Sequence, residues 1–193
     1  MNENTRVTLY RGKFLALVKE GRWEYAERVG DLGAVVVVAV TAEQKLLLVE
    51  QYRIPVHRRT IELPAGIVGD EPAAASESIA GAAKRELLEE TGYAAERVEM
   101  LMTGPASSGL TSEIITLMLA SGLKRLQAGG GVAQEDITLH EVPLSQIDVW
   151  LAAKTSEGLL IEPKVYAGLY FLNRASILND TPAGENRSPR RSS

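Results

Sequence analysis

The longest apolar run in the chain, Ala34–Val40, reads AVVVVAV. Valine is β-branched, and an apolar run without polar alternation is typical of a strand that is buried on both faces. A second run of this kind, Lys45–Tyr52, follows a polar turn at Thr41–Gln44. Both are far shorter than the roughly 20 residues that a helix needs to cross a bilayer. The two runs therefore predict strands in the core of a soluble domain.

The rest of the chain mixes strands with helices. Residues 6–18 and 22–29 predict a β-hairpin that turns at Glu20-Gly21. Apolar spacing predicts a helix that ends at Thr91, with Ser76 or Ser78 as its N-cap and Gly92 as its C-terminal stop. We expect further strands at 61–63, 98–102, 114–119 and 137–142, and further helices at 145–154 and 164–178.

Strands and helices do not alternate strictly along this chain, which argues against a doubly wound sheet. We therefore expect an α/β (α+β) fold in which helices flank a mixed β-sheet. The hairpin forms an N-terminal extension, residues 1–33, and the main domain spans residues 34–178. The polar segment 179–193 predicts a disordered tail.

Composition excludes several classes of protein. The chain of 193 residues carries 21 basic and 25 acidic side chains, a formal charge of −4, whereas nucleic-acid binders carry a clear positive excess. It holds no cysteine, which excludes disulfide scaffolds, Cys-based zinc sites and Cys nucleophiles. The first residues, MNENTR, lack the apolar run of a signal peptide. We expect a cytoplasmic protein that binds neither nucleic acid nor membranes.

The most informative segment is a glutamate cluster in residues 85–93, which read RELLEETGY. On a helix, Glu86, Glu89 and Glu90 lie on neighbouring parts of one face, where like charges repel by a few tenths of a kcal/mol per pair. Such a face is commonly just solvated. Clustered carboxylate oxygens are also what Mg²⁺ or Mn²⁺ requires, and a bound cation offsets the repulsion. Arg85 is placed to orient one of the carboxylates.

This segment resembles the Nudix box, whose core is Arg-Glu-apolar-x-Glu-Glu-x-Gly-apolar. Glu77, eight residues before Arg85, matches the earlier fixed glutamate of that motif. Six fixed matches in one register have a chance of about 10⁻⁵ over this length. One position departs from the motif, because Glu71 stands where the box opens with glycine. Gly66 lies eleven residues before Glu77, so the loop is five residues longer than the family pattern, with the insertion near Gly69–Ala75.

The flanking segments resemble the Nudix group that hydrolyses ADP-ribose and other nucleoside diphosphate sugars. The resemblance covers about residues 6–175 and implies a homodimer that swaps its N-terminal hairpins. The segments that carry it are EQYR at 50–53, ELPAG at 62–66, SSGLTSE at 107–113 and QEDI at 134–137.

The resemblance also implies roles for single residues. Metal ligands are expected at Glu86, Glu90 and the Ala65 carbonyl, with Glu89 as a further ligand or the Arg85 partner. Glu77 is expected to act through water or to support the helix. The general base is expected at Glu135, which follows three glycines, with Glu113 and Glu89 as rivals.

Substrate contacts are expected from several side chains outside the box. Arg53 suits phosphate oxygens because its guanidinium is a planar fork, and Arg58 and Arg59 are candidates of the same kind. By resemblance, Glu62 accepts hydrogen bonds from ribose or base, and Glu113 lies in a substrate loop. Trp23 either stacks on a nucleobase of the partner subunit's ligand or packs in the core or the dimer interface.

Three functions remain open on the sequence alone. The leading one is metal-dependent hydrolysis of a nucleoside diphosphate sugar to a nucleoside monophosphate and a sugar phosphate. A second keeps the fold but acts on dinucleoside polyphosphates or capped RNA ends. A third is a catalytically silent Nudix domain that binds a nucleotide as a regulator. The presence of all four box glutamates argues against this third function.

Overall fold

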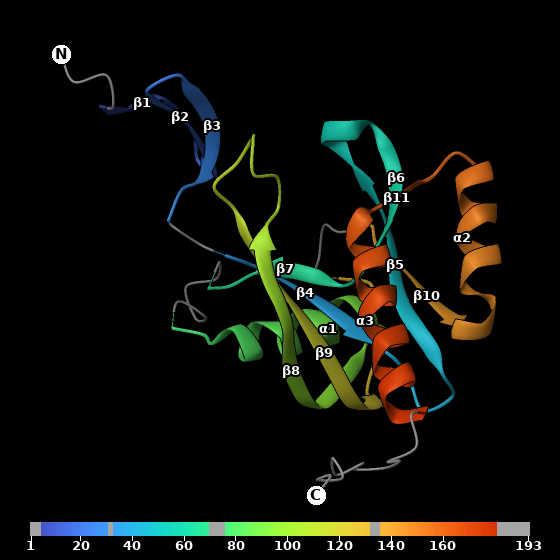
Figure 1. Cartoon of the computed structure of the whole chain (residues 1–193). Coiled ribbons are helices and arrows are strands. Elements are labelled where there is room, and N and C mark those ends of the chain that lie inside the picture. The colour runs from blue at the N-terminus through green and yellow to red at the C-terminus, as the bar shows by residue number, and fades with distance from the viewer. Residues whose placement is uncertain (1–4, 31–32, 70–75, 132–135, 181–193) are drawn as a thin grey trace, which may run out of the picture.

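A computed structural model describes residues 5–30, 33–69, 76–131 and 136–180, with side chains as far as Arg174. The described residues form a three-stranded N-terminal sheet, two four-stranded sheets and three α-helices (Figure 1). The N-terminal sheet projects from one end of the body, which contains the other two sheets and the helices (Figure 1).

The N-terminal segment is a three-stranded antiparallel sheet rather than the predicted hairpin. Its strands are β1 (Arg6–Arg11), β2 (Leu15–Glu20) and β3 (Trp23–Arg28), in that order. Residues 6–18 were predicted as one strand, but the chain reverses between β1 and β2, where Gly12 N–H donates to Leu15 O. The predicted turn at Glu20-Gly21 is confirmed between β2 and β3, with Gly21 at φ 56°.

The body contains two mixed sheets where the sequence predicted one. In the first, the two central strands are parallel and the outer pairs are antiparallel. In the second, one edge strand pairs in parallel with its neighbour, and the other two pairs are antiparallel. The first sheet has the order β7 (Ala65–Ile67), β4 (Ala34–Ala39), β9 (Ile114–Arg125), β8 (Tyr93–Pro105). The second has the order β10 (Thr138–Pro143), β5 (Lys45–Arg53), β6 (Arg58–Glu62), β11 (Leu160–Ile161).

Strands β8 and β9 are much longer than predicted because they continue to pair with each other, from Tyr93 opposite Arg125 to Pro105 opposite Ile114. The helices are α1 (Ile79–Thr91), α2 (Ile147–Ser156) and α3 (Pro163–Asp180), with 3-10 turns η1 (Ile54–Val56) and η3 (Leu144–Gln146). The predicted tail began at Asn179, but α3 includes Asn179 and Asp180; residues 181–193 lie outside the described residues.

The core is organised by the two faces of β4. Val35 and Val37 pack in a cluster with Ala82, Ala83 and Leu87 of α1. The alternate residues Val36 and Val38 pack in a second cluster with β5 and β6 residues and with Ile147, Leu151 and Val165 of the other helices. Successive side chains of a strand point to opposite faces, so β4 is buried on both sides, as the apolar run predicted.

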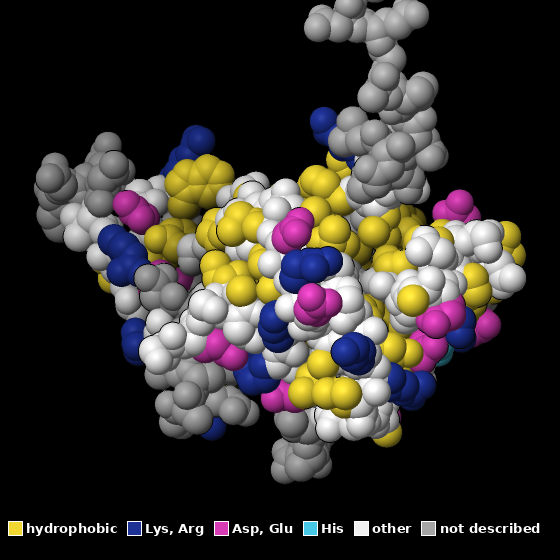
Figure 2. All heavy atoms as spheres, turned by 90° about the horizontal axis from the view of Figure 1, so that it is seen from below, with side chains coloured by type: hydrophobic (Ala, Val, Ile, Leu, Met, Phe, Trp, Pro, Cys, Tyr) yellow, Lys and Arg dark blue, Asp and Glu magenta, His cyan; other side chains and the backbone are white. Residues whose placement is uncertain are grey.

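The surface seen in Figure 2 carries Lys and Arg side chains interspersed with Asp and Glu. Single-sign fields of the kind that steer nucleic acid do not dominate that face. Among the described residues, none of the helices combines the length and apolar character that crossing a bilayer requires.

Candidate active site

Helix α1 is fixed at both ends by its own sequence. The Ser78 hydroxyl accepts a hydrogen bond from Gly81 N–H at 3.0 Å, which makes Ser78 rather than Ser76 the N-cap. Gly92 ends the helix in the left-handed conformation at φ 76°, as predicted. The apolar face of the helix packs on the first sheet. This packing turns the opposite edge of the helix, with Glu86 and Glu90, toward a cavity.

Arg85 links the glutamates of this helix. Its guanidinium donates to Glu86 Oε1 at 2.8 Å, Glu89 Oε2 at 3.3 Å and Glu77 Oε1 at 3.3 Å, and it also donates to the Ile67 carbonyl at 3.2 Å. Burial disfavours the charge of Arg85, but the hydrogen bonds and charges of the glutamates outweigh it and raise its pKa. The predicted pairing of Arg85 is confirmed, with three carboxylates instead of one.

Strand β7 lies against the same glutamates. Ala65 N–H donates to Glu90 Oε2 at 3.1 Å. At Gly66, a Cβ atom would stand 1.8 Å from Glu86 Oε1, so any larger residue requires this carboxylate to move. Ala65 and Gly66 pair with β4, and Pro64 O accepts from Val37 N–H at 2.8 Å. Glu86 and Glu90 are held almost fully buried, 8% and 5% exposed.

The cavity has a volume of about 800 Å³ and lies between α1 with β7 on one side and β5, β6 and the start of α3 on the other. Its lining carries six carboxylates against four cationic side chains. Each cation is paired with a lining carboxylate: Arg85 as described, Arg28 with Glu113, Arg53 with Glu62, and Lys164 with Glu162. The described lining therefore has an excess of negative charge and commits its positive charges to ion pairs.

The wall opposite α1 is built around Arg53 and Glu62. Arg53 is the last residue of β5, and its Nε and Nη2 donate to the two Glu62 oxygens at 2.8 and 2.6 Å. The Thr60 hydroxyl also bonds Glu62. Burial opposes ionisation of Glu62, but the hydrogen bonds from Arg53 and Thr60 prevail and lower its pKa. The two residues that were predicted to contact substrate separately form one bidentate ion pair.

The structure adds Glu162 and Lys164, which sequence reasoning missed. Glu162 precedes α3, and its backbone N–H donates to Ile61 O at 2.9 Å, which anchors it on β6. Its Oε2 is buried and lacks a hydrogen-bond partner within the described residues. Burial raises the pKa of Glu162. Glu162 and Lys164 flank Pro163 at the start of α3 and belong to no sequence motif, so only the position of β11 beside β6 reveals them.

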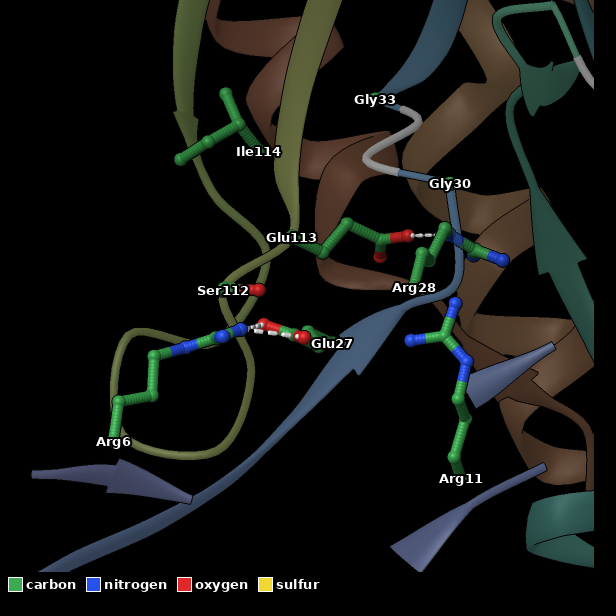
Figure 3. A pocket seen from close by; sticks show the side chains of 9 residues that line it. All are labelled: Arg6, Arg11, Glu27, Arg28, Gly30, Gly33, Ser112, Glu113 and Ile114. Carbon is green, nitrogen blue, oxygen red and sulfur yellow. Dashed lines mark hydrogen bonds and ion pairs between the residues drawn. The ribbon is translucent and has the colours of Figure 1, made fainter. Parts of the chain in front are cut away.

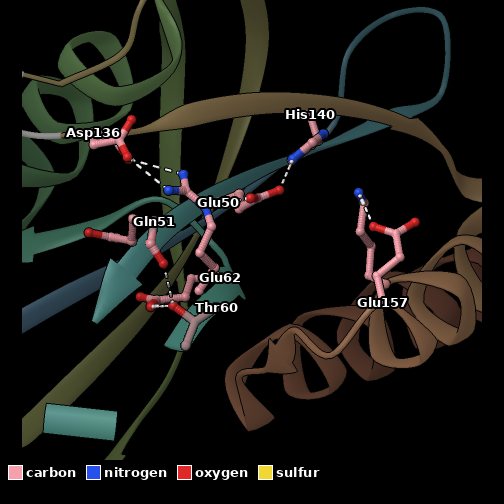
Figure 4. Close-up of polar contacts among 9 residues, drawn as sticks. Glu50, Gln51, Thr60, Glu62, Asp136, His140 and Glu157 are labelled. Atoms are coloured by element: carbon pink, nitrogen blue, oxygen red, sulfur yellow. Dashed lines mark hydrogen bonds and ion pairs between the residues drawn. The ribbon is translucent and has the colours of Figure 1, made fainter. Parts of the chain in front are cut away.

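The other predicted site residues are placed as follows. Glu113 lines the cavity and pairs with Arg28. Arg59 donates to Glu50 at 2.6 Å and Asp136 at 2.8 Å, and Glu50 also bonds His140 (Figure 4). Neither Arg59 nor Trp23 is in the cavity lining. Trp23 is 53% exposed at the start of β3. Glu135 lies outside the described residues.

Comparison with known proteins gives the family. A family model described as NUDIX domain matches residues 31–156. The chain belongs to the Nudix family. Its box is the α1 segment described above, and the expected fold class is confirmed. The lengthened box loop remains an expectation, because residues 70–75 lie outside the described part of the chain.

Curated relatives of this Nudix chain carry three different names. It is 37% identical over 129 residues to a "Methanol dehydrogenase activator" of Bacillus methanolicus, covering 65% of this chain and 66% of the relative. It is 36% identical over 127 residues to an "ADP-ribose pyrophosphatase" of Bacillus subtilis (strain 168), covering 62% and 65%. A "GDP-mannose pyrophosphatase" of Citrobacter koseri is 30% identical over 198 residues, covering 90% and 98%. The matches thus span slightly under two thirds of the first two relatives.

A solved structure titled "Crystal structure of ADP compounds hydrolase" has the same fold. It matches with a TM-score of 0.71 at 18% identity, covering 91% of this chain and 94% of that chain. The similarity thus covers most of both chains.

Nudix hydrolases generally need a divalent metal ion. Among the described residues, no three Asp, Glu or His side chains are gathered in a metal-binding group, and Arg85 forms ion pairs with Glu77, Glu86 and Glu89. The donor chemistry nevertheless fits, because Mg²⁺ keeps several waters and takes only one or two protein carboxylates together with substrate phosphates. Glu86 and Glu90 are buried oxygen donors on the acidic wall of the cavity.

Proposed function

We propose that this Nudix chain hydrolyses the pyrophosphate bond of nucleoside diphosphate sugars such as ADP-ribose, giving a nucleoside monophosphate and a sugar phosphate. The observation that carries the proposal is a cavity of about 800 Å³ that has the glutamates of the box helix on one wall and the Arg53–Glu62 pair on the other. The names of the Bacillus subtilis and Citrobacter koseri relatives support this substrate class.

Charge balance supports a requirement for Mg²⁺ or Mn²⁺. A pyrophosphate is anionic, and the cavity lining already carries two more carboxylates than cations. Anionic substrate in such a cavity is repelled unless further positive charge is present. Glu86 and Glu90 would hold the cation, with Glu89, Glu77 and the Ala65 carbonyl as further candidates. A bound divalent ion would neutralise charge and lower the pKa of its water.

The side chains of this chain supply orientation and proton transfer. Arg85 fixes the rotamers of Glu86 and Glu89 through its hydrogen bonds. Arg53 donates to Glu62 through Nε and Nη2, and this ion pair would position the Arg53 guanidinium beside the substrate. Glu135 is our candidate for the base that removes a proton from the attacking water, with Glu113 and Glu89 as rivals.

We further propose that the functional unit is a homodimer that forms through the N-terminal sheet. Tyr10 of β1 and Leu17 of β2 stand opposite each other on one face of this sheet and are 68% and 40% exposed. Leu15, on the same strand and face, is 50% exposed. Exposed contiguous apolar side chains on a small sheet are typical of a protein–protein contact. Trp23 at the edge of this sheet would then lie at or near the partner.

The name of the Bacillus methanolicus relative favours a second candidate, activation of another enzyme. The retained box glutamates argue that hydrolysis is the primary activity even so. A substrate panel tests both. ADP-ribose, GDP-mannose and a dinucleoside polyphosphate are ranked by kcat/KM with Mg²⁺ and with Mn²⁺, and products are identified by chromatography. Nucleotide sugars should rank first; absence of turnover on all three compounds would leave the activator function as the better account.

A further inference from the structure

A second cavity, of about 570 Å³, lies between the N-terminal sheet and the segment that precedes β9 (Figure 3). Its polar lining comes from Arg6, Arg11, Glu27, Arg28, Ser112 and Glu113. The two walls are joined by backbone hydrogen bonds, because Ala26 N–H donates to Leu110 O at 2.9 Å and Ser112 N–H donates to Ala26 O at 3.1 Å. The cavity is therefore a built feature of the fold.

The three arginines of this cavity differ in how many of their donors are used. Arg6 donates twice to Glu27, at 2.6 and 2.5 Å. Arg28 uses only its Nε, toward Glu113, so its two terminal nitrogens have no partner among the described residues. Arg11 makes no hydrogen bond or ion pair within the described part of the chain. In Figure 3 the Arg11 side chain extends toward the Arg28 guanidinium.

The lining holds three guanidinium groups against two carboxylates, and Glu27 and Glu113 pair with Arg6 and Arg28, so the positive charge of Arg11 is left uncompensated within the described lining and attracts an anion. The planar fork of arginine matches phosphate oxygens, and a phosphate monoester offers three terminal oxygens that two guanidiniums can share. Ser112 places a further hydroxyl in the lining. The volume exceeds that of a phosphate alone, so a group attached to the phosphate also fits.

We propose that this cavity is a binding site for a phosphate monoester group, held by Arg11 and by the terminal nitrogens of Arg28. Arg28 and Glu113 line the catalytic cavity as well, so the two sites share a wall. The phosphate is carried either by the far end of a nucleotide substrate or by a free anion. Only the first source rests on the proposed hydrolase function, since binding of free phosphate needs no turnover.

Binding is measured by titration calorimetry with inorganic phosphate in the presence of Mg²⁺, on the full chain and on two variants. Arg11→Ala should weaken phosphate binding by about tenfold, because it removes charge-assisted hydrogen bonds. The control is Arg22→Ala, an exposed arginine of the same sheet outside the cavity lining, which should bind as the parent does. Phosphate that binds with Mg²⁺ at the catalytic glutamates should contribute the same binding heat in all three proteins, so it does not affect their comparison.

Kinetics then separate the two sources. If the phosphate belongs to the substrate, kcat/KM for the 2′-phosphate of ADP-ribose should exceed that for ADP-ribose about tenfold, and Arg11→Ala should bring the ratio near one. If the phosphate is free, the ratio should be near one in the parent while Arg11-dependent calorimetric binding persists. Phosphate binding that is equal in the parent and Arg11→Ala, together with an unchanged substrate ratio, would overturn the proposal.

Discussion

Gly66 on β7 lies so close to Glu86 on α1 that a Cβ at this position would stand 1.8 Å from the Glu86 Oε1 atom. Arg85 Nη1 donates to the same Oε1 atom at 2.8 Å, so the buried Glu86 carboxylate is held by this hydrogen bond in the space that a side chain at position 66 would need. A side chain at position 66 therefore requires the Glu86 carboxylate to leave this position.

Gly66→Ala should therefore displace the Glu86 carboxylate. We expect a loss of kcat of about 10²-fold, as for other displacements of about 1 Å in active sites, and a destabilisation of about 1–3 kcal/mol from overpacking. Steady-state kinetics and chemical denaturation measure the two effects. Gly109→Ala is the matched control, since a Cβ there meets no atom within 4 Å. Parent-like kcat in Gly66→Ala would show that the position of Glu86 does not matter.

The Arg53–Glu62 pair makes stability depend on pH. The folded state lowers the pKa of Glu62 below its ordinary value of 4.5, so the pair stabilises the fold above that value. This stabilisation is lost as the pH falls through the lowered pKa. Glu62→Gln should cost about 1–2 kcal/mol at pH 7, a range kept low because Arg53 is 45% exposed.

Urea denaturation of the parent chain and Glu62→Gln, at steps from pH 7 to below pH 4.5, should show the difference in unfolding free energy narrowing with acidity. Glu99→Gln, on an exposed position of β8, serves as the control for loss of one carboxylate. A difference that stays constant over the whole range would contradict the ion pair as its cause.

Glu135→Gln tests the candidate general base. If Glu135 removes the proton from the attacking water, kcat should fall by about 10²–10⁴-fold while KM changes little. Single-turnover kinetics at saturating substrate measure the chemical step directly. A loss below tenfold would transfer the role to Glu113 or Glu89, both of which line the catalytic cavity.

Leu17→Glu tests the proposed dimer. The substitution puts a charge in the exposed apolar face of the N-terminal sheet, where burial of an unpaired carboxylate is costly. Light scattering after size-exclusion chromatography should give twice the chain mass of 20.9 kDa for the parent and 20.9 kDa for the variant. Val149→Glu, at an exposed apolar position on α2, should remain dimeric. A monomeric parent protein would refute this proposal.

The sequence predicted the parts of the structure that depend on local patterns. Helix α1 could be predicted because its apolar spacing, its N-cap Ser78 and its C-cap Gly92 are all local features of the sequence. Strand β4 was predictable because a short, continuous run of β-branched valine is typical of a strand with two buried faces.

Features that join distant segments were not predictable. Arg28 and Glu113 lie 85 residues apart, and their contact depends on how β3 docks against the segment before β9. Arg53 and Glu62 were singled out separately, but their ion pair depends on the pairing of β5 with β6. The reversal between β1 and β2 was missed because residues 6–18 favour strand on both sides of it. Tertiary contacts decided each of these points.

The most direct test of the account is nucleoside monophosphate release from ADP-ribose by the parent chain and by Glu90→Gln, assayed with Mg²⁺ and Mn²⁺. The substitution keeps the size of a side chain that is 5% exposed and can retain the Ala65 hydrogen bond, while it removes the charge. We predict metal-dependent release of AMP by the parent chain and by Glu99→Gln, and a loss of kcat/KM of at least about 10³-fold in Glu90→Gln. Near-parental turnover by a folded Glu90→Gln protein would contradict the assignment of this glutamate helix as the catalytic metal site.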